Sequence, residues 1–253
     1  MAWWNGLARR RYQDLIPRRV VDEEEQTIFY GNPDLEPRTA QSFDLMYERF
    51  TSGLGVVAIG AFYKRFNAFH ADRMFQESID GVPYDARQTV MGDGTASYLG
   101  LEVSFNQRLD FLGSTARDFS VFGNYNYTSS EGDVEGRTLP LTNSPEHTAN
   151  LSLLYDNARS GLSFVIATNY RAAMLTNIGD AAHRDAYVDD ELHLDFSVAK
   201  SLTERLTASA QVNGLTARRE REILGNPRDA GARLRQWQEY GPYATLNVQY
   251  RMR

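Results

Sequence analysis

The chain has 253 residues, a length that suits one large domain or two small ones. Thirty-three acidic against 27 basic side chains give a net charge of −6, which argues against a protein that works by neutralising nucleic-acid phosphates. The absence of cysteine excludes disulfides and cysteine-ligated metal sites, and no apolar run approaches the roughly 18 residues of a membrane-spanning helix. A transmembrane β-barrel stays open as a class, because its strands need only every second residue to be apolar.

Apolar and polar residues alternate in runs of about ten along most of the chain. In the clearest run, Leu99, Leu101, Val103 and Phe105 alternate with polar or small residues, which indicates a strand with two different faces. The pattern predicts an all-β fold of about ten strands in an antiparallel up-and-down meander. In chain order we expect strands at Trp3–Arg11, from about Ala40, and at Gly55–Phe69, Leu99–Asn106, Phe119–Thr128, Thr148–Tyr155, Leu162–Arg171, Leu192–Val198, Leu206–Asn213 and Ala244–Arg251.

The connections between these strands alternate between short and long. Short turns are expected at Ser52–Gly55, Gly113–Asp118, Asn157–Ser160 and Thr203–Arg205, and long polar segments at Ile16–Thr39, Gln76–Thr95, Glu131–Glu146, Leu175–Asp190 and Ala217–Glu239. Tight turns at one rim and long loops at the other are typical of outer-membrane barrels. We therefore predict a single β-barrel domain over residues 1–253, with the C-terminus at the short-turn rim.

Residues that could carry chemistry are few. None of the four histidines has a zinc-ligand spacing, and no nucleotide or nucleophile motif is present, so we predict no metal, no cofactor and no catalytic residue. His193 and Asp195 share one face of a strand, which keeps open the alternative of a ten-stranded outer-membrane hydrolase. A small independent pore and a soluble ligand-binding β-barrel are further alternatives.

Aromatic and basic residues suggest two other roles. The strand tyrosines Tyr125, Tyr127, Tyr155 and Tyr170 lie on the apolar face, as in the aromatic bands at membrane boundaries. The long segments hold candidate ligand contacts, since exposed rings can stack on a ligand and arginines attract anions. These candidates are Tyr84, Tyr187, Arg228, Arg233, Arg235 and Trp237.

The segment Gly31–Glu48 carries Asn32, Pro33, Leu35 and Pro37, followed by a strand. It resembles the Asn-Pro-x-Leu-x-Pro-Glu motif of TonB-dependent outer-membrane receptors. Two prolines restrict the backbone, so a long loop reaches the strand in a stiff geometry. Further segments resemble the same family in the same order: LARRRYQDLIP, GVVAIGAFYKRFNAF, SYLGLEVSFNQRL, FGNYNYTSS and LHLDFSVAKSL.

The resemblance implies a place in the outer membrane of a Gram-negative bacterium and a role in transport. In the family that this sequence resembles, the complete receptor has a 22-stranded barrel, an N-terminal plug and a TonB box. Because this sequence shows neither a plug pattern nor such a box, we expect the C-terminal part of the barrel. In the complete receptor, the implied partners are membrane lipid, a scarce nutrient (a siderophore, a cobalamin-like molecule or an oligosaccharide), and TonB through the plug only, with no nucleic acid.

Overall fold

The computed structural model describes residues 1–51, 55–114 and 116–252. The turn expected at Ser52–Gly55 lies almost entirely outside these residues, and the one expected at Gly113–Asp118 lies partly outside them. Among the described residues, the only α-helix is α1 (Tyr12–Leu15), and no helix is long and apolar enough to cross a membrane.

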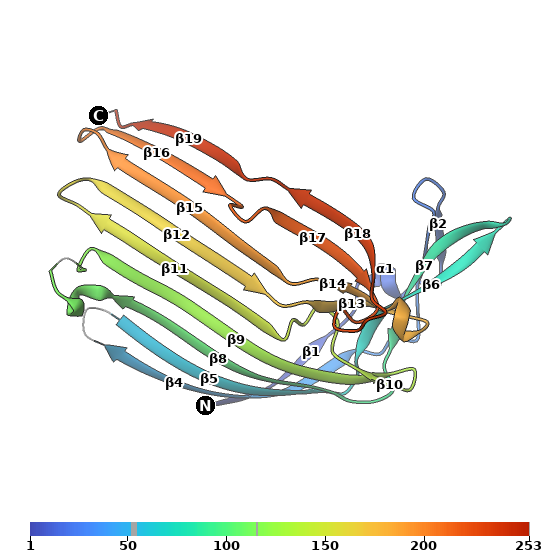
Figure 1. The fold of residues 1–253 in the computed structure, drawn as a ribbon. Coiled ribbons are helices and arrows are strands. Elements are labelled where there is room, and N and C mark those ends of the chain that lie inside the picture. Colours follow the sequence, from blue (N-terminus) through green and yellow to red (C-terminus); the bar gives the residue numbers. More distant parts are fainter. Residues whose placement is uncertain (52–54, 115, 253) are drawn as a thin grey trace.

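Ten strands follow one another in a main sheet, in which every strand is antiparallel to its neighbours (Figure 1). Their order is β1 (Ala2–Ala8), β4 (Arg38–Thr51), β5 (Gly55–Phe66), β8 (Ala96–Arg108), β9 (Phe119–Val134), β11 (His147–Asn157), β12 (Leu162–Arg171), β15 (Glu191–Ser201), β16 (Leu206–Asn213) and β19 (Tyr243–Tyr250). A short strand, β10 (Arg137–Leu139), pairs with β9, and a 3₁₀ helix, η1 (Leu109–Leu112), follows β8. The expected antiparallel meander is confirmed, and within the described residues the sheet is open, with β1 and β19 at its edges.

The two faces of the main sheet differ as the alternation predicts. On one face, Leu101 and Leu151 are about half exposed, at 52% and 48%. On the other face, amides hydrogen-bond from strand to strand: Asn150 Nδ2 donates to Asn124 Oδ1 at 2.8 Å, and Asn169 Nδ2 donates to Asn150 Oδ1. The sheet therefore has an apolar outer face and a polar inner face.

Aromatic rings gather on the apolar face close to the short turns. Phe119, Tyr155 and Phe164 come from three adjacent strands, with ring centroids 4.8 Å apart for the first pair and 5.1 Å for the second. Phe196 extends the group onto β15, 6.4 Å from Phe164. The position of Tyr155 agrees with an aromatic band at a membrane boundary.

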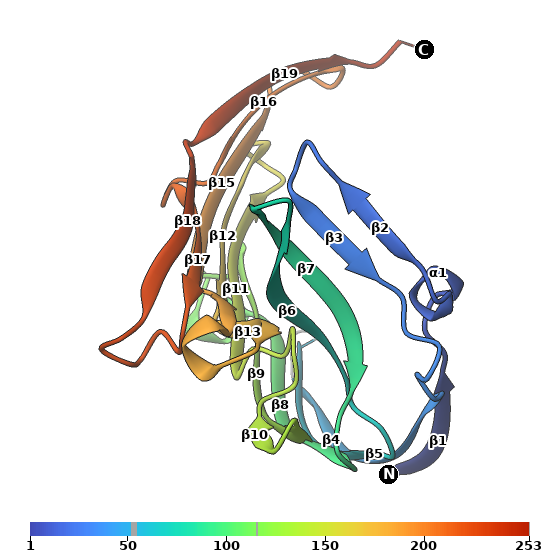
Figure 2. The same ribbon diagram turned by 90° about the vertical axis from the view of Figure 1, so that its right-hand side faces the viewer.

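The long segments form a second sheet rather than irregular loops. Its order is β18 (Arg233–Tyr240), β17 (Arg218–Leu224), β14 (Ala186–Val188), β13 (Met174–Gly179), β6 (His70–Ile79), β7 (Val82–Met91), β3 (Thr27–Tyr30) and β2 (Arg19–Asp22), with a 3₁₀ helix, η2 (Ala182–Arg184), between β13 and β14. Two of its pairings, β3 with β7 and β13 with β6, are parallel and join separate segments. In Figure 2 the main sheet is an open arc, and β3 and β7 lie on its open side.

The buried hydrophobic side chains gather in and beside the second sheet. One cluster contains Phe69, Val134, Leu175 and Ile178, each at most 3% exposed. The main sheet is a single layer, and within the described residues no other layer packs on its apolar face, so its hydrophobic residues stay exposed in the protein alone. An apolar medium is required to cover them.

We predict that Leu151→Arg reduces folding of the chain into lipid vesicles, because it places a charge on the apolar face. For a residue near the bilayer midplane the cost is about 2–4 kcal/mol. Ser152→Arg is the matched control, since the neighbouring residue faces the opposite side. Unfolding in urea measures both variants, and equal losses of stability would contradict the assignment of the faces.

Hydrogen bonds also tie the β2–β3 hairpin to β6. Glu77 accepts from Arg19 Nη2 at 2.7 Å and from the Tyr30 hydroxyl at 2.6 Å. The hydroxyl and then the guanidinium hold the pKa of Glu77 below its ordinary value of 4.5. A carboxylate with a lowered pKa stabilises the folded state above its ordinary pKa, and this contribution is lost as the pH falls through the lowered value.

We therefore expect the hairpin to be protected from amide exchange near neutral pH and to lose protection as the pH falls below 4.5, the ordinary pKa of a glutamate, and through the lowered pKa of Glu77. Hydrogen exchange of the β3 amides measures the effect. Glu77→Gln should remove the pH dependence of exchange, because a neutral amide has no proton to gain. A variant that kept the wild-type pH dependence would show that another group is responsible.

Candidate functional site

Two of the six predicted ligand-contact residues share one cavity at the long-loop end. Tyr187 and Arg228 line a cavity of about 280 Å³ together with hydroxyl side chains such as Ser130. Arg228 Nη2 lies 3.3 Å from Glu146 Oε2, another lining residue. Burial raises the pKa of Tyr187, and the nearby Asp185 carboxylate adds to this effect, so its hydroxyl stays protonated and can donate a hydrogen bond.

The other three candidates from the last long segment lie on β18. Arg235 forms ion pairs with Asp85 at 2.8 Å and Glu222 at 2.9 Å, and so joins β18 to β7 and β17. Trp237 is 58% exposed, and Arg233 is exposed at the start of the strand. Trp237 and Arg233 remain accessible to a ligand, whereas Arg235 is held by its two carboxylate partners.

The expectation that Tyr84 faces outward from a long loop is corrected by its burial. Tyr84 lies in β7, is only 9% exposed and belongs to a hydrophobic cluster with Ile28 and Ala86. The parallel pairing of β3 with β7 places Ile28 beside Ala86. The sequence pattern could not show this pairing, because the two strands are far apart in the chain.

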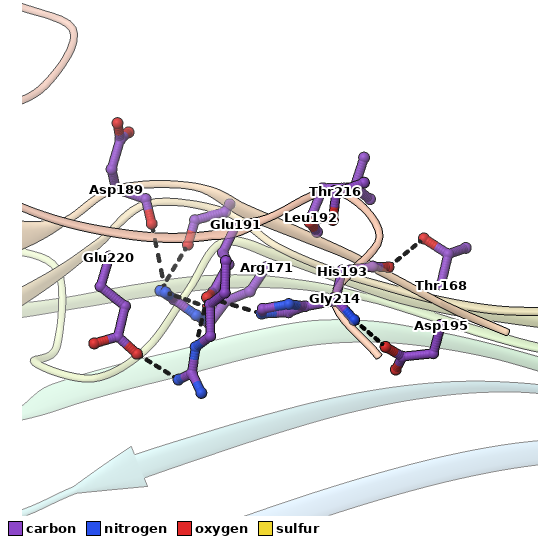
Figure 3. A network of polar contacts seen from close by, with 12 residues as sticks. Thr168, Arg171, Asp189, Glu191, Leu192, His193, Asp195, Gly214, Thr216 and Glu220 are labelled. Carbon is purple, nitrogen blue, oxygen red and sulfur yellow. Dashed lines mark hydrogen bonds and ion pairs between the residues drawn. The ribbon is translucent and has the colours of Figure 1, made fainter. Parts of the chain in front are cut away.

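A cluster of charged side chains lies on the inner face where β12 and β15 meet the second sheet (Figure 3). We call it the Glu191 cluster; its members are Arg171, Asp189, Glu191, His193, Arg218, Glu220 and Arg221. Glu191 is at the centre: its carboxylate oxygens lie 2.8 Å from His193 Nε2, 3.1 Å from Arg218 Nε and 3.4 Å from Arg171 Nη2.

The outer members of the cluster complete its charge balance. Arg218 also reaches Glu220 at 2.5 Å, and Arg221 reaches Asp189 at 2.5 Å. The side chains of Glu191 and Asp189 are each only 12% exposed, so arginines rather than water balance their charges.

The cluster borders a cavity of about 700 Å³ that His193, Asp195 and Arg218 line together with Tyr240 and Tyr243. This wall offers a polar ligand fixed charges, amides and two aromatic rings.

His193 and Asp195 share the inner face, as the sequence predicts, but they have separate partners. His193 contacts Glu191, while Asp195 Oδ1 accepts a hydrogen bond from the Gly214 backbone amide at 2.8 Å (Figure 3). In a hydrolytic site the carboxylate would orient the histidine ring. Among the described residues, no group of three or more His, Cys, Asp or Glu side chains could hold a metal ion.

The motif residues have structural roles. Asn32 donates its backbone amide to the Asp14 carbonyl at 2.7 Å and its side-chain amide to the Thr89 carbonyl at 3.0 Å. Leu35 is 7% exposed. Pro33 lies in a turn and Pro37 directly precedes β4, and both restrict the backbone. The motif therefore fastens α1 to β7 before the chain enters β4.

Sequence reasoning identified His193 but missed Arg171, Glu191 and Arg218. A usable signal existed for the first two: Arg171 is the last residue of the predicted strand Leu162–Arg171, and Glu191 directly precedes the predicted strand Leu192–Val198, so both have the parity of the inner face at the long-loop end. In the structure they are register partners across β12 and β15. Arg218 comes from a segment expected to be a loop, and no local pattern indicates its place.

We predict that Glu191→Gln loosens the junction between β15 and β17, because Arg171, Arg218 and His193 lose their common carboxylate. The expected cost is about 1–3 kcal/mol, seen as faster amide exchange in β17. Glu220→Gln is the control, since the Glu220 side chain is more exposed and, among the described residues, has its ion pair with Arg218 only. Equal effects of the two variants would contradict a central role for Glu191.

Comparisons with known proteins complete the description. A family model described as "TonB dependent receptor-like, beta-barrel" matches residues 5–215. The iron-regulated outer membrane virulence protein of Vibrio cholerae serotype O1 is 28% identical over 201 residues, which cover 74% of this chain and 28% of that protein.

Solved structures share the fold at low identity. The ferric enterobactin receptor PfeA of Pseudomonas aeruginosa, in complex with enterobactin, matches with a TM-score of 0.59 and 13% identity, over 98% of this chain and 37% of that one. The ferric citrate transporter FecA matches with a TM-score of 0.57 and 17% identity, over 86% and 31%. The chain thus spans only about a third of the length of these proteins.

Proposed function

Because this chain belongs to the TonB-dependent receptor family, as a match to the family's β-barrel over residues 5–215 shows, we propose that it forms part of the wall of a receptor for a ferric siderophore. The protein is accordingly an outer-membrane protein of a Gram-negative bacterium, and its ten-strand sheet is part of a transmembrane barrel. The observation that carries the proposal is the two-faced main sheet, with its apolar outer face and its hydrogen-bonded polar inner face.

The choice of a ferric siderophore is supported by the relatives. One is named for iron regulation, and the solved structures that match include receptors for ferric enterobactin and a ferric citrate transporter. These names describe the relatives, and from them we infer the class of ligand for this receptor. A cobalamin-like molecule and an oligosaccharide are the competing nutrients.

In this proposal the second sheet faces the outside of the cell and the short turns face the periplasm. A ligand arriving from outside first meets the second sheet, which carries Tyr187, Arg233 and Trp237, and the β17–β18 connection, which carries Arg228. It then meets the inner wall, where the Glu191 cluster provides fixed charges. TonB acts through the plug of the complete receptor, and membrane lipid covers the apolar face.

We also propose that residues 1–253 form one domain and that the protein is not an enzyme. The second sheet is built from the connections of the main sheet, so neither is complete without the other. The separate partners of His193 and Asp195 weigh against the alternative of an outer-membrane hydrolase.

The test is nutrient uptake by the producing bacterium with and without the gene for this chain. We expect deletion to abolish the energy-dependent uptake of one radioactive ferric chelate, supplied as ferric enterobactin or ferric citrate, and to leave cobalamin uptake unchanged. A plasmid copy should restore uptake, and a protonophore should remove it again. Loss of cobalamin or oligosaccharide uptake, with both iron chelates unaffected, would refute the ligand class.

A further inference from the structure

A further cavity lies beside the second sheet, between α1 and strands β3 and β7. It is a cavity of about 350 Å³, which falls in the size range of small-molecule sites. Four arginines line it (Arg10, Arg11, Arg18 and Arg87) together with two aspartates (Asp14 and Asp72). We call it the arginine pocket.

The two aspartates neutralise only two of the four arginines. Asp72 is paired with Arg87 and also accepts a hydrogen bond from the Thr89 hydroxyl at 2.7 Å. Asp14 lies 3.7 Å from Arg11, with its side chain 5% exposed. Within the described residues, Arg18 has no side-chain partner, and Arg10 contacts only His70. The pocket therefore holds two positive charges in excess, in a chain whose net charge is −6.

The contact between Arg10 and His70 leaves this excess unchanged. Arg10 Nε lies 3.4 Å from His70 Nδ1, and because a guanidinium can only donate, the ring nitrogen must accept. His70 is 4% exposed, and its Nε2 has no hydrogen-bond partner. Burial, followed by the charges of Arg10 and Arg38, lowers the pKa of His70, so the ring is neutral and supplies no counter-charge.

The wall that carries Arg10 and Arg18 is held in place before any ligand binds. The Gly31 amide donates to the Arg18 carbonyl at 3.0 Å, and Asn32 ties the segment to β7 through Thr89. A Cβ at position 31 would lie 1.8 Å from the Ile16 carbonyl oxygen, so only glycine allows this close approach. A fixed wall reduces the entropy lost on binding.

We propose that the arginine pocket binds an oxyanion group, either a phosphate or a carboxylate of a small ligand or lipid headgroup. Guanidinium groups match the planar, two-pronged geometry of both anions. A nucleic-acid backbone does not fit, because the pocket is a single cavity rather than an extended groove and the chain is acidic overall. The site is separate from the Glu191 cluster and does not depend on the ligand class proposed above.

The experiment is calorimetric titration of the full chain in detergent at low ionic strength with three probes: inorganic pyrophosphate, citrate and lipid A in mixed micelles. Binding of pyrophosphate or citrate identifies a soluble anion as the source of the group, and binding of lipid A alone identifies a lipid headgroup. Arg18→Gln should weaken binding about tenfold, since one charged hydrogen-bond donor is lost.

Two variants make the test specific. Arg159→Gln removes the same charge from an exposed turn at the short-turn rim and should leave affinity unchanged. Arg10→Gln should weaken binding as Arg18→Gln does. The absence of binding by all three probes, or an equal loss of affinity in Arg159→Gln, would overturn the proposal.

Discussion

The main sheet is a single layer of hydrogen-bonded strands with an apolar outer face, and the part of the chain that the structure describes packs no further layer against that face. Its backbone groups are paired from strand to strand between the edge strands β1 and β19, but side chains such as Leu151 and Val248 stay exposed on the outer face. The fully buried Ile28, Leu175 and Ile178 lie in the second sheet instead. Such a sheet is stable only where an apolar medium covers one face and a polar environment meets the other, which is the situation of a barrel wall in a bilayer.

The polar features of the molecule follow from this division. Many of the charged side chains lie on the inner face and at the long-loop end. There the second sheet holds them with ion pairs, as in the Glu191 cluster, or leaves them in excess, as in the arginine pocket. The long segments between the strands of the main sheet thus have two roles. They contain the hydrophobic core, and they position the charged residues of the Glu191 cluster and the arginine pocket.

Local patterns in the sequence determined the strands and their two faces, because period-two alternation is a property of consecutive residues. Leu99–Asn106 and Leu162–Arg171 show this, since the strands observed there are β8 and β12. The second sheet escaped the same reasoning because its parallel pairings join distant segments: Ile28 lies beside Ala86, and Ile178 beside Arg73. For that reason Tyr84 could be mistaken for an exposed loop residue, and Arg218 could not be placed beside Glu191.

The account depends most directly on which face of the main sheet touches lipid. Spin labels placed one at a time along β11, from Thr148 to Leu153, in vesicles would measure this through collision with oxygen and with a water-soluble nickel complex. The account predicts a period of two, with high oxygen collision at Ala149, Leu151 and Leu153 and high nickel collision at Asn150 and Ser152. Uniform access of the nickel complex to all these positions would contradict a membrane-facing sheet.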